Sequence, residues 1–351
     1  WQNFTGNSFL NPLLAQVYRE NGFDVWTTQS PGADNRLLLF GGGALQSNLY
    51  HAPSIYGRGT TDRNTIIAEL QLQNRSRTAQ LGLARVPCLT DPVFLKAAAI
   101  AYSEFGAFFQ RISPAFLNLG DECVFAPHAS NEDLCFSETC VRDFQAFVRS
   151  EYDSIEAVNA EYGTSYKRFT EVVPVPLEKA MADPRLVPVW IDHRRHADVV
   201  WARHLGRVRE WVVAAAPGVR VGYEGSGDTG HGPANGALTA TDYYRLAHAM
   251  DVNGTYYWPF QLDTVRDFSA PGSLIGGGWF GGYPQMLRAN HDPVAQVWWT
   301  WNTIFRGANS IWVYAGTDNA VWSVVAPDFS FHDYFRETLR QIAILKGGVG
   351  K

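Results

Sequence analysis

The stretch that decides the fold is Ala115-Phe116-Leu117-Asn118-Leu119-Gly120-Asp121-Glu122, an apolar run that ends in a glycine and two acids. A short apolar run followed by a turn residue is typical of a buried strand in a parallel sheet. In parallel α/β barrels the active site lies at the carboxyl ends of the strands. The run therefore predicts an α/β fold with Asp121 and Glu122 at its functional edge.

Strand-like runs alternate with amphipathic helical segments along most of the chain, the pattern of repeated βαβ units. Strands are predicted over residues 22–28, 36–40, 115–119, 219–224, 252–258, 274–280 and 309–315. Helices are predicted over residues 11–21, 92–111, 138–152, 193–216, 239–250, 291–305 and 331–346. Seven strands fall one short of a (β/α)8 TIM-type barrel, so we expect the opening strand at residues 1–4 or upstream of this sequence.

Two irregular stretches, 41–82 and 170–188, are longer than ordinary βα connections and are predicted to be insertions that shape a cleft. A length of 351 residues suits one catalytic-type barrel domain over residues 1–351. Because the chain starts with Trp1 instead of Met, it is either a processed chain or a piece of a longer one. A removed secretion signal would fit, which favours a secreted or periplasmic protein over a cytoplasmic one.

Composition narrows the class of partner. A formal net charge of −5 with 18% charged residues argues against a nucleic-acid-binding surface. No apolar run approaches the roughly 20 residues that cross a bilayer, so we expect no membrane partner. An aromatic share of 14% with 12 tryptophans suits a cleft for an oligo- or polysaccharide, since sugar C–H faces stack on flat rings. A core rich in half-buried tryptophan explains this composition equally well.

Asp121 and Glu122, the acids that end the quoted stretch, are residue types that glycoside hydrolysis uses. Glycoside hydrolysis needs one protonated carboxyl group and a second, ionised one. Neighbouring residues on a strand point to opposite sides, so only one of Asp121 and Glu122 is expected to face a sugar. We predict that Glu122 is the general acid/base and that Asp121 lies beside the substrate. The alternative is that the Asp-Glu pair caps the helix that follows.

Two later stretches, Cys135-Phe-Ser-Glu-Thr-Cys140-Val-Arg-Asp-Phe144-Gln-Ala-Phe147 and Val158-Asn159-Ala-Glu-Tyr-Gly163-Thr164, carry a resemblance. A cysteine cluster after the acid/base glutamate and a Leu-Asn-x-x-Trp-Gly-Thr-like turn are similar to those of the family 42 glycoside hydrolases. The resemblance implies a clan A barrel, a retaining mechanism and β-galactosidase or neighbouring exo-acting specificity. It also implies a homo-oligomer, with a trimer as the expected form.

The chain departs from that family at two positions. Asp121 stands where the family usually has an asparagine, and residues 273–283, which match the family's nucleophile region, contain no carboxylate. Glu224, at the end of a predicted strand, is the first candidate for the second carboxylate. Retaining and inverting mechanisms both stay open, and an inactive or altered glycan-binding barrel is the alternative to a hydrolase.

The four cysteines are Cys88, Cys123, Cys135 and Cys140. By resemblance, Cys88, Cys135 and Cys140 match positions that bind a structural zinc ion in the family. Ser137 stands where another family ligand would be, and Cys123 is a candidate for the fourth sulfur. Two disulfides are the preferred alternative, because four cysteines in a secreted chain pair naturally. No cofactor is expected for catalysis.

Aromatic residues at predicted strand ends are candidates for lining the sugar cleft: Trp258, Trp279, Tyr283 and Tyr314. Trp298, Trp299 and Trp301 lie instead on a predicted helix. Their spacing cannot bury all three on one face, so at least one is expected to meet solvent, another domain or a partner subunit.

Overall fold

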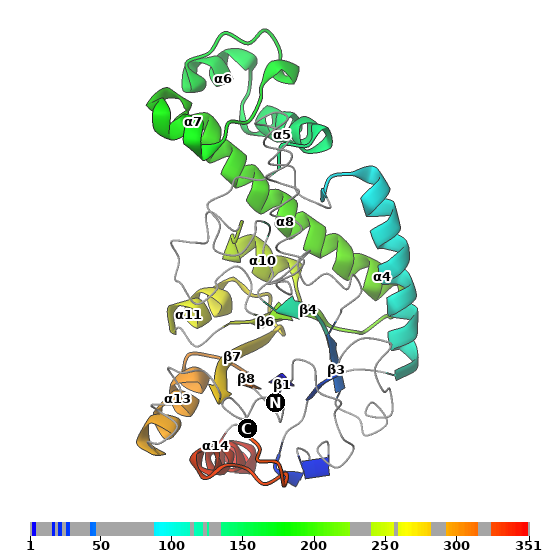
Figure 1. Cartoon of the computed structure of the whole chain (residues 1–351), viewed down its shortest axis with the longest axis vertical. Helices are drawn as coiled ribbons and strands as arrows, with labels where there is room; N and C mark the ends of the chain where they lie inside the picture. Colours follow the sequence, from blue (N-terminus) through cyan, green and yellow to red (C-terminus); the bar gives the residue numbers. More distant parts are fainter. Residues whose placement is uncertain are drawn as a thin grey trace.

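A computed structural model shows an eight-stranded parallel sheet with the strand order β1-β8-β7-β6-β5-β4-β3-β2 (Figure 1). The end strands β1 and β2 contact each other, so the strands form a ring and the predicted (β/α)8 barrel is confirmed. The structure describes residues 2–4, 16–17, 20–22, 26–28, 43–46, 88–112, 116–121, 125, 135–224, 240–255, 259–281, 293–314 and 324–349.

The strands are β1 (Gln2–Phe4), β2 (Trp26–Thr28), β3 (Gly43–Gln46), β4 (Leu117–Asp121), β5 (Val221–Glu224), β6 (Val252–Gly254), β7 (Leu274–Gly281) and β8 (Ser310–Tyr314). β1 is the opening strand and pairs with β8, so it lies within this sequence. The prediction that residues 41–82 are irregular throughout was wrong. β3 falls inside the stretch 41–82 that was predicted to be irregular, because four residues with one glycine are too few to show a periodic pattern. The predicted strand 36–40 lies outside the described residues.

The α-helices are α4 (Pro92–Ile112), α5 (Glu138–Glu151), α6 (Ile155–Tyr162), α7 (Leu177–Ala182), α8 (Val187–Ala215), α10 (Tyr243–Ala249), α11 (Pro259–Phe268), α13 (Pro293–Phe305) and α14 (Asp333–Ile344). Shorter turns are η3 (Phe169–Glu171), η4 (Pro184–Leu186) and the π-helical η6 (Leu345–Val349). The stretch 170–188, predicted to be irregular, contains α7 and η4, and α8 begins before the predicted residue 193. Pro188 does not prevent this earlier start, because a proline in the first turn lacks only an N–H that has no partner there.

Trp312 of β8 fills the inside of the barrel. Its side chain is 1% exposed and its ring stacks on Phe116 with ring centroids 6.1 Å apart. Two glycines make room for it, since a Cβ atom at Gly276 would lie 2.0 Å from the indole Cε2 and one at Gly254 would lie 2.1 Å from Cζ3. The glycines of β6 and β7 are therefore required by packing against Trp312.

The outer side of the sheet packs against α4 and α8. In this main core the strand residues are Leu117, Leu119, Val221 and Tyr223. The helix residues include Tyr102 of α4 and Trp201 of α8, both fully buried. On the far side of the barrel, Trp299 and Trp301 of α13 pack on a second core, whereas Trp298 is 53% exposed. The prediction that at least one tryptophan of this helix leaves the buried face is confirmed.

The 29-residue helix α8 links the barrel to a group of helices beyond it. In Figure 1 its N-terminal half lies beside α5, α6 and α7, and its C-terminal half lies beside α4. Asp192 of α8 is 4% exposed and accepts hydrogen bonds from Tyr152 Oη at 2.7 Å and Tyr162 Oη at 2.8 Å. Arg195 Nη1 donates to its other oxygen at 2.8 Å. This carboxylate therefore fastens the inserted helices to α8.

We predict that Gly276→Ala lowers the free energy of unfolding by about 1–3 kcal/mol, because the added methyl group collides with Trp312. Gly206→Ala on α8 is the matched control, since its nearest neighbour would be Ala249 Cβ at 3.9 Å. That change should leave stability equal or higher by up to about 1 kcal/mol, because alanine favours a helix. Urea unfolding measures both. A Gly276→Ala chain as stable as the parent would contradict the assigned packing.

Candidate active site and metal centre

The carboxyl ends of β4 and β5 bring two predicted acids to one edge of the barrel. The two strands pair in parallel, and Asp121 at the end of β4 lies opposite Glu224 at the end of β5. Glu122 follows Asp121 directly in the sequence and lies outside the described residues. Backbone register thus places Glu224 on the strand next to the acid pair, at the edge where barrels of this kind bind their ligands.

The register of this pairing shifts between Asn118 and Asp121, so β4 carries an extra residue there. Such bulges turn a strand and redirect its side chains, and they are frequent beside active sites. The expectation that Asp121 and Glu122 point to opposite sides assumed a regular strand, and the irregular register removes that assumption. Both residues stay candidates for the mouth of the barrel.

The predicted aromatic residues are partly placed. Trp279 lies in β7, and Tyr314 is the last residue of β8, opposite Gly281 of β7 and Phe4 of β1. Tyr314 therefore stands at the same carboxyl edge as Glu224. Trp258, Tyr283 and Cys123 lie outside the described residues. β7 runs over Leu-Ile-Gly-Gly-Gly-Trp-Phe-Gly, so the strand itself carries no carboxylate.

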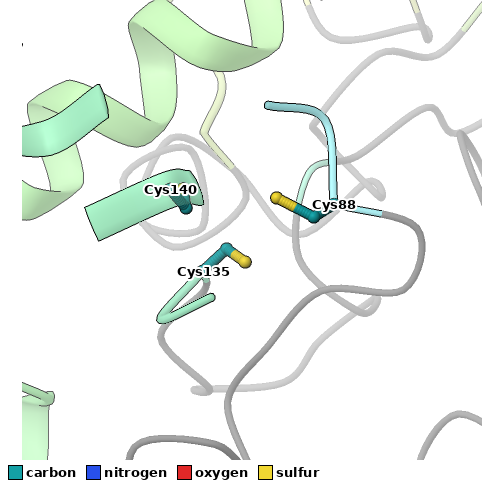
Figure 2. Close-up of side chains that lie close together, drawn as sticks. All are labelled: Cys88, Cys135 and Cys140. Atoms are coloured by element: carbon teal, nitrogen blue, oxygen red, sulfur yellow. The ribbon is translucent and has the colours of Figure 1, made fainter. Parts of the chain in front are cut away.

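Three cysteines gather at the beginnings of two helices (Figure 2). The sulfur atoms of Cys88, Cys135 and Cys140 all lie within 4.8 Å of one another. Cys88 precedes α4, while Cys135 and Cys140 flank the start of α5. Because a helix N-terminus carries a partial positive charge, two such ends favour the negative charge of thiolates at this place.

The preference for disulfides is wrong for these three residues, since each is a thiol and not half of a disulfide. Their sulfurs surround one point, which would leave one sulfur over if two of them paired. Hydrogen bonds from Cys135 and then Cys140 lower the pKa of Cys88, against the opposing effect of burial. The same contacts with Cys135 and Cys88, together with burial, raise the pKa of Cys140.

The three cysteines fit a thiophilic metal ion. Zinc–sulfur bonds of about 2.3 Å in tetrahedral geometry separate the sulfurs by roughly 3.8 Å, so small side-chain rotations are enough. Cysteine sulfur is a preferred zinc ligand, and Cys135 and Cys140 are buried from competing water. Among the described residues this cysteine triad can therefore hold a metal such as zinc.

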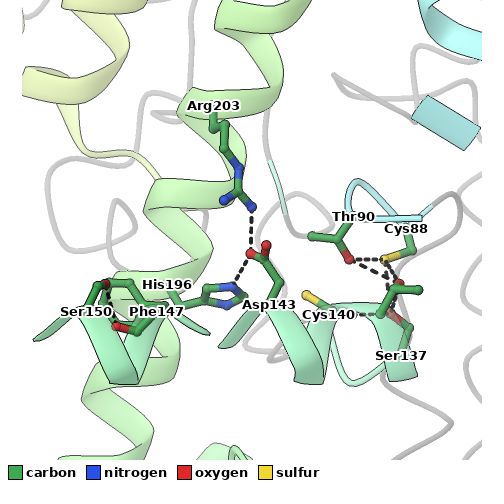
Figure 3. Close-up of polar contacts among 10 residues, drawn as sticks. Cys88, Thr90, Ser137, Cys140, Asp143, Phe147, Ser150, His196 and Arg203 are labelled. Atoms are coloured by element: carbon green, nitrogen blue, oxygen red, sulfur yellow. Dashed lines mark hydrogen bonds and ion pairs between the residues drawn. The ribbon is translucent and has the colours of Figure 1, made fainter. Parts of the chain in front are cut away.

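A partly buried polar network lies beside the cysteine cluster on α5 and α8 (Figure 3). Asp143 Oδ2 accepts from His196 Nε2 at 2.8 Å and from Arg203 Nη2 at 2.6 Å. Burial alone would raise the pKa of Asp143, but these hydrogen bonds outweigh it and lower the pKa. Sequence reasoning missed this network. Only tertiary packing brings residue 143 next to residues 196 and 203.

Asp198 of α8 lies in surroundings that disfavour the charged form of its carboxyl group. Its Oδ1 is buried and has no hydrogen-bond partner in the part of the chain that the structure describes. Burial, with the nearby charge of Asp242, raises its pKa to about 7, against weaker opposing effects of Arg194, Arg245 and Arg195. Folding therefore makes this carboxyl harder to ionise than it is in the unfolded chain.

The model of the family 42 glycoside hydrolases, described as beta-galactosidase, matches residues 68–269, more than half of the 351-residue chain. The chain belongs to this family. No curated protein sequence matches it. The matched range of family 42 contains the cysteine centre, β4, β5, β6 and α8.

Solved structures agree on the fold. The β-galactosidase of the psychrophilic Marinomonas ef1 superposes with a TM-score of 0.66 at 12% identity, covering 99% of this chain and 58% of that one. The β-galactosidase of Bacillus circulans sp. alkalophilus gives 0.64 at 13% identity, covering 99% and 56%. The catalytic domain of the Paenibacillus polymyxa β-amylase gives 0.66 at 14%, covering 98% and 97%. The chain thus spans little more than half the length of these β-galactosidases, and the likeness establishes the barrel.

The segment from Val158 to Thr164, one of those that resemble family 42, stabilises the local backbone through hydrogen bonds of Asn159. Asn159 Oδ1 accepts from Thr164 Oγ1 at 2.9 Å and from the Tyr166 N–H at 2.8 Å, and its Nδ2 donates to the Tyr166 carbonyl at 2.8 Å. Gly163 ends α6 with a φ of 64°, a left-handed conformation that favours glycine. The motif therefore shapes the turn after α6.

Among the described residues, no helix is both long and apolar enough to span a membrane.

We predict that Asp198→Asn stabilises the protein more at pH 8 than at pH 5. The folded-state pKa of about 7 lies above the ordinary value of 3.8, so this carboxyl favours folding at low pH and loses that contribution as pH rises through 7. Melting temperatures across pH 4–9 measure the effect. The exposed Asp153→Asn is the control and should give a flat difference, and an Asp198→Asn difference that is equally flat would contradict the raised pKa.

Proposed function

We propose that the chain hydrolyses a β-linked glycan, with a galactoside as the first substrate class to test. Glu122 serves as general acid/base and Glu224 as the second carboxylate. The observation that carries the proposal is the register of β4 and β5, in which Asp121 lies opposite Glu224 at the carboxyl edge. Family 42 membership supports the same reaction class.

Strand packing supports an inward place for position 224. Val221 and Tyr223 of β5 belong to the core between the sheet and the helices. Successive strand residues alternate between faces, so positions 222 and 224 fall on the barrel side. Adjacent strands lie about 4.8 Å apart, which brings position 224 within reach of a group at the end of β4. Two carboxyl groups near 5 Å apart suit a covalent intermediate, and about 6.5–9.5 Å suits inversion through water.

The aromatic candidates complete the proposed cleft. Tyr314 and Trp279 on the β8 and β7 side, with Trp258 and Tyr283, supply flat apolar faces against which the C–H face of a sugar packs. Asp121 supplies a hydrogen-bond acceptor for a sugar hydroxyl. A homo-oligomer, with a trimer expected, and a secreted or periplasmic location stay predictions alongside this proposal.

A second candidate function is glycan binding without hydrolysis. It is favoured by one observation, the absence of a carboxylate from β7, where the family resemblance implies the nucleophile. In such a protein the aromatic residues at the mouth would retain sugar while no covalent step occurs. Binding and turnover measured on the same glycans distinguish the two functions.

For the cysteine centre we propose a bound zinc ion with a structural role. Cys88, Cys135 and Cys140 would hold it and thereby join the beginning of α4 to the beginning of α5. When bound, the ion would neutralise the repulsion between neighbouring thiolates. The residues proposed for catalysis do not include these cysteines.

We predict that Glu122→Gln lowers kcat/KM for aryl β-galactosides by about 100- to 10,000-fold, because the amide cannot donate a proton to the leaving oxygen. Glu156→Gln on the exposed face of α6 is the matched control and should keep full activity. Undiminished turnover by Glu122→Gln would refute the acid/base assignment.

Glu224→Ala is expected to reduce turnover by a similar factor, with rescue by added azide if residue 224 is a nucleophile. Retained activity would remove Glu224 while leaving Glu122 in place. If the parent chain binds galactosides without turnover, glycan binding replaces hydrolysis as its function.

We also predict about one zinc ion per purified chain, with little zinc in Cys135→Ser. Chelation should lower the melting temperature of the parent, because the ion links two helix beginnings. The same chelator should leave the already metal-poor Cys135→Ser unchanged. Zinc-free parent protein that loses no stability on chelation would contradict the structural role.

A further inference from the structure

Ser137 occupies a central position in the cysteine centre (Figure 3). Its Oγ lies 3.0 Å from Cys88 Sγ and 3.3 Å from Thr139 Oγ1. It also accepts a hydrogen bond from the Cys140 N–H at 3.2 Å and so caps the N-terminus of α5. One hydroxyl thus caps the helix α5 and also contacts the sulfur of Cys88.

These contacts use the proton and one of the two lone pairs of the Ser137 hydroxyl. The oxygen accepts from the backbone as the N-cap of α5, and its proton is close enough to Cys88 to be donated to the sulfur. A neutral hydroxyl is also not among the usual zinc ligands, which are thiolates, imidazoles and carboxylates. Ser137 is therefore placed to support a ligand and not to act as one.

Two more hydroxyls surround the same sulfur. Thr90 Oγ1 lies 3.1 Å from Cys88 Sγ, and Thr139 Oγ1 lies 3.4 Å from it. Thr90 donates to Thr139 at 3.1 Å, so the three hydroxyls form a connected group around Cys88. The single proton of Thr90 goes to Thr139, so Ser137 and Thr139 are the hydroxyls of this group that are left to donate to the Cys88 sulfur. Hydrogen bonds donated to a thiolate draw electron density away from any ion that it binds, and such outer groups tune metal affinity.

We propose that the centre binds its ion through three thiolates only, and that the fourth position is left to an exchangeable ligand such as water. Among the described His, Cys, Asp and Glu residues, Cys88, Cys135 and Cys140 are the group whose donor atoms converge. Structural zinc sites are usually closed by four protein ligands, so the zinc proposed above, on which this inference rests, would sit in a structural site with one position open. On this proposal the fourth position stays open because residue 137 offers a hydroxyl and not a thiolate.

Cobalt(II) substitution tests the proposal, because the sulfur-to-cobalt absorption in the near ultraviolet grows with the number of bound thiolates. We expect Ser137→Cys to raise this absorption per cobalt by about one third, from three thiolates to four. Competition with a chromophoric chelator should show zinc bound on the order of 10- to 100-fold more tightly by Ser137→Cys than by the parent. Neither measurement depends on glycosidase activity.

Three control variants make the outcome decisive. Ser137→Ala should keep the parent's thiolate absorption, although it loses the α5 cap, and Cys140→Ser should lose about one third of it. Cys123→Ser should leave the parent spectrum unchanged. A parent spectrum that already shows four thiolates and falls with Cys123→Ser would overturn the proposal. So would a parent that binds no cobalt, or a Ser137→Cys chain with unchanged absorption and affinity.

Discussion

The barrel depends on one packing constraint, the indole of Trp312 enclosed by the strands. Its ring occupies the space that side chains at positions 254 and 276 would otherwise fill. Phe116 and Val252 complete this small interior cluster, and Val252 is itself close-packed against Gly222. Because β5, β6, β7 and β8 contribute to these contacts, and Phe116 directly precedes β4, the carboxyl edges of β4 and β5 are held in a fixed register. That register sets the backbone positions of Asp121 and Glu224.

A second constraint comes from buried charge on α8. The Asp192 carboxylate is buried, which is unfavourable unless the charge finds several partners, whereas Asp143 and Arg203 of the Asp143–His196–Arg203 group stay partly exposed. Two tyrosines and an arginine serve Asp192, while a histidine and an arginine serve Asp143. These contacts favour the observed arrangement of the inserted helices on α8. That arrangement fixes α5, and with it two of the three cysteines.

The cysteine centre and the proposed catalytic edge are thus both positioned by the same scaffold. Cys88 lies where the connection after β3 enters α4, and Cys135 lies where the connection after β4 enters α5. A centre that joins these two points ties together the connections of neighbouring strands. The cysteine centre can therefore help to hold the mouth of the barrel in shape without taking part in the reaction.

The sequence by itself indicated the fold class, because alternating apolar strands and amphipathic helices are typical of an α/β fold with a parallel sheet. It also located β4 and β5, the acids at their ends and the cysteines, since these are local patterns. It misplaced β3, whose four residues show no periodicity, and it assumed a regular strand where β4 carries an extra residue. Only the tertiary structure decided that three cysteines converge as thiols, that Ser137 lies among them and that Asp143 meets His196. Those contacts join residues about 50 positions apart, and the separation of Cys88 from Ser137 is 49. Local sequence patterns carry no information about which distant side chains will share one buried space.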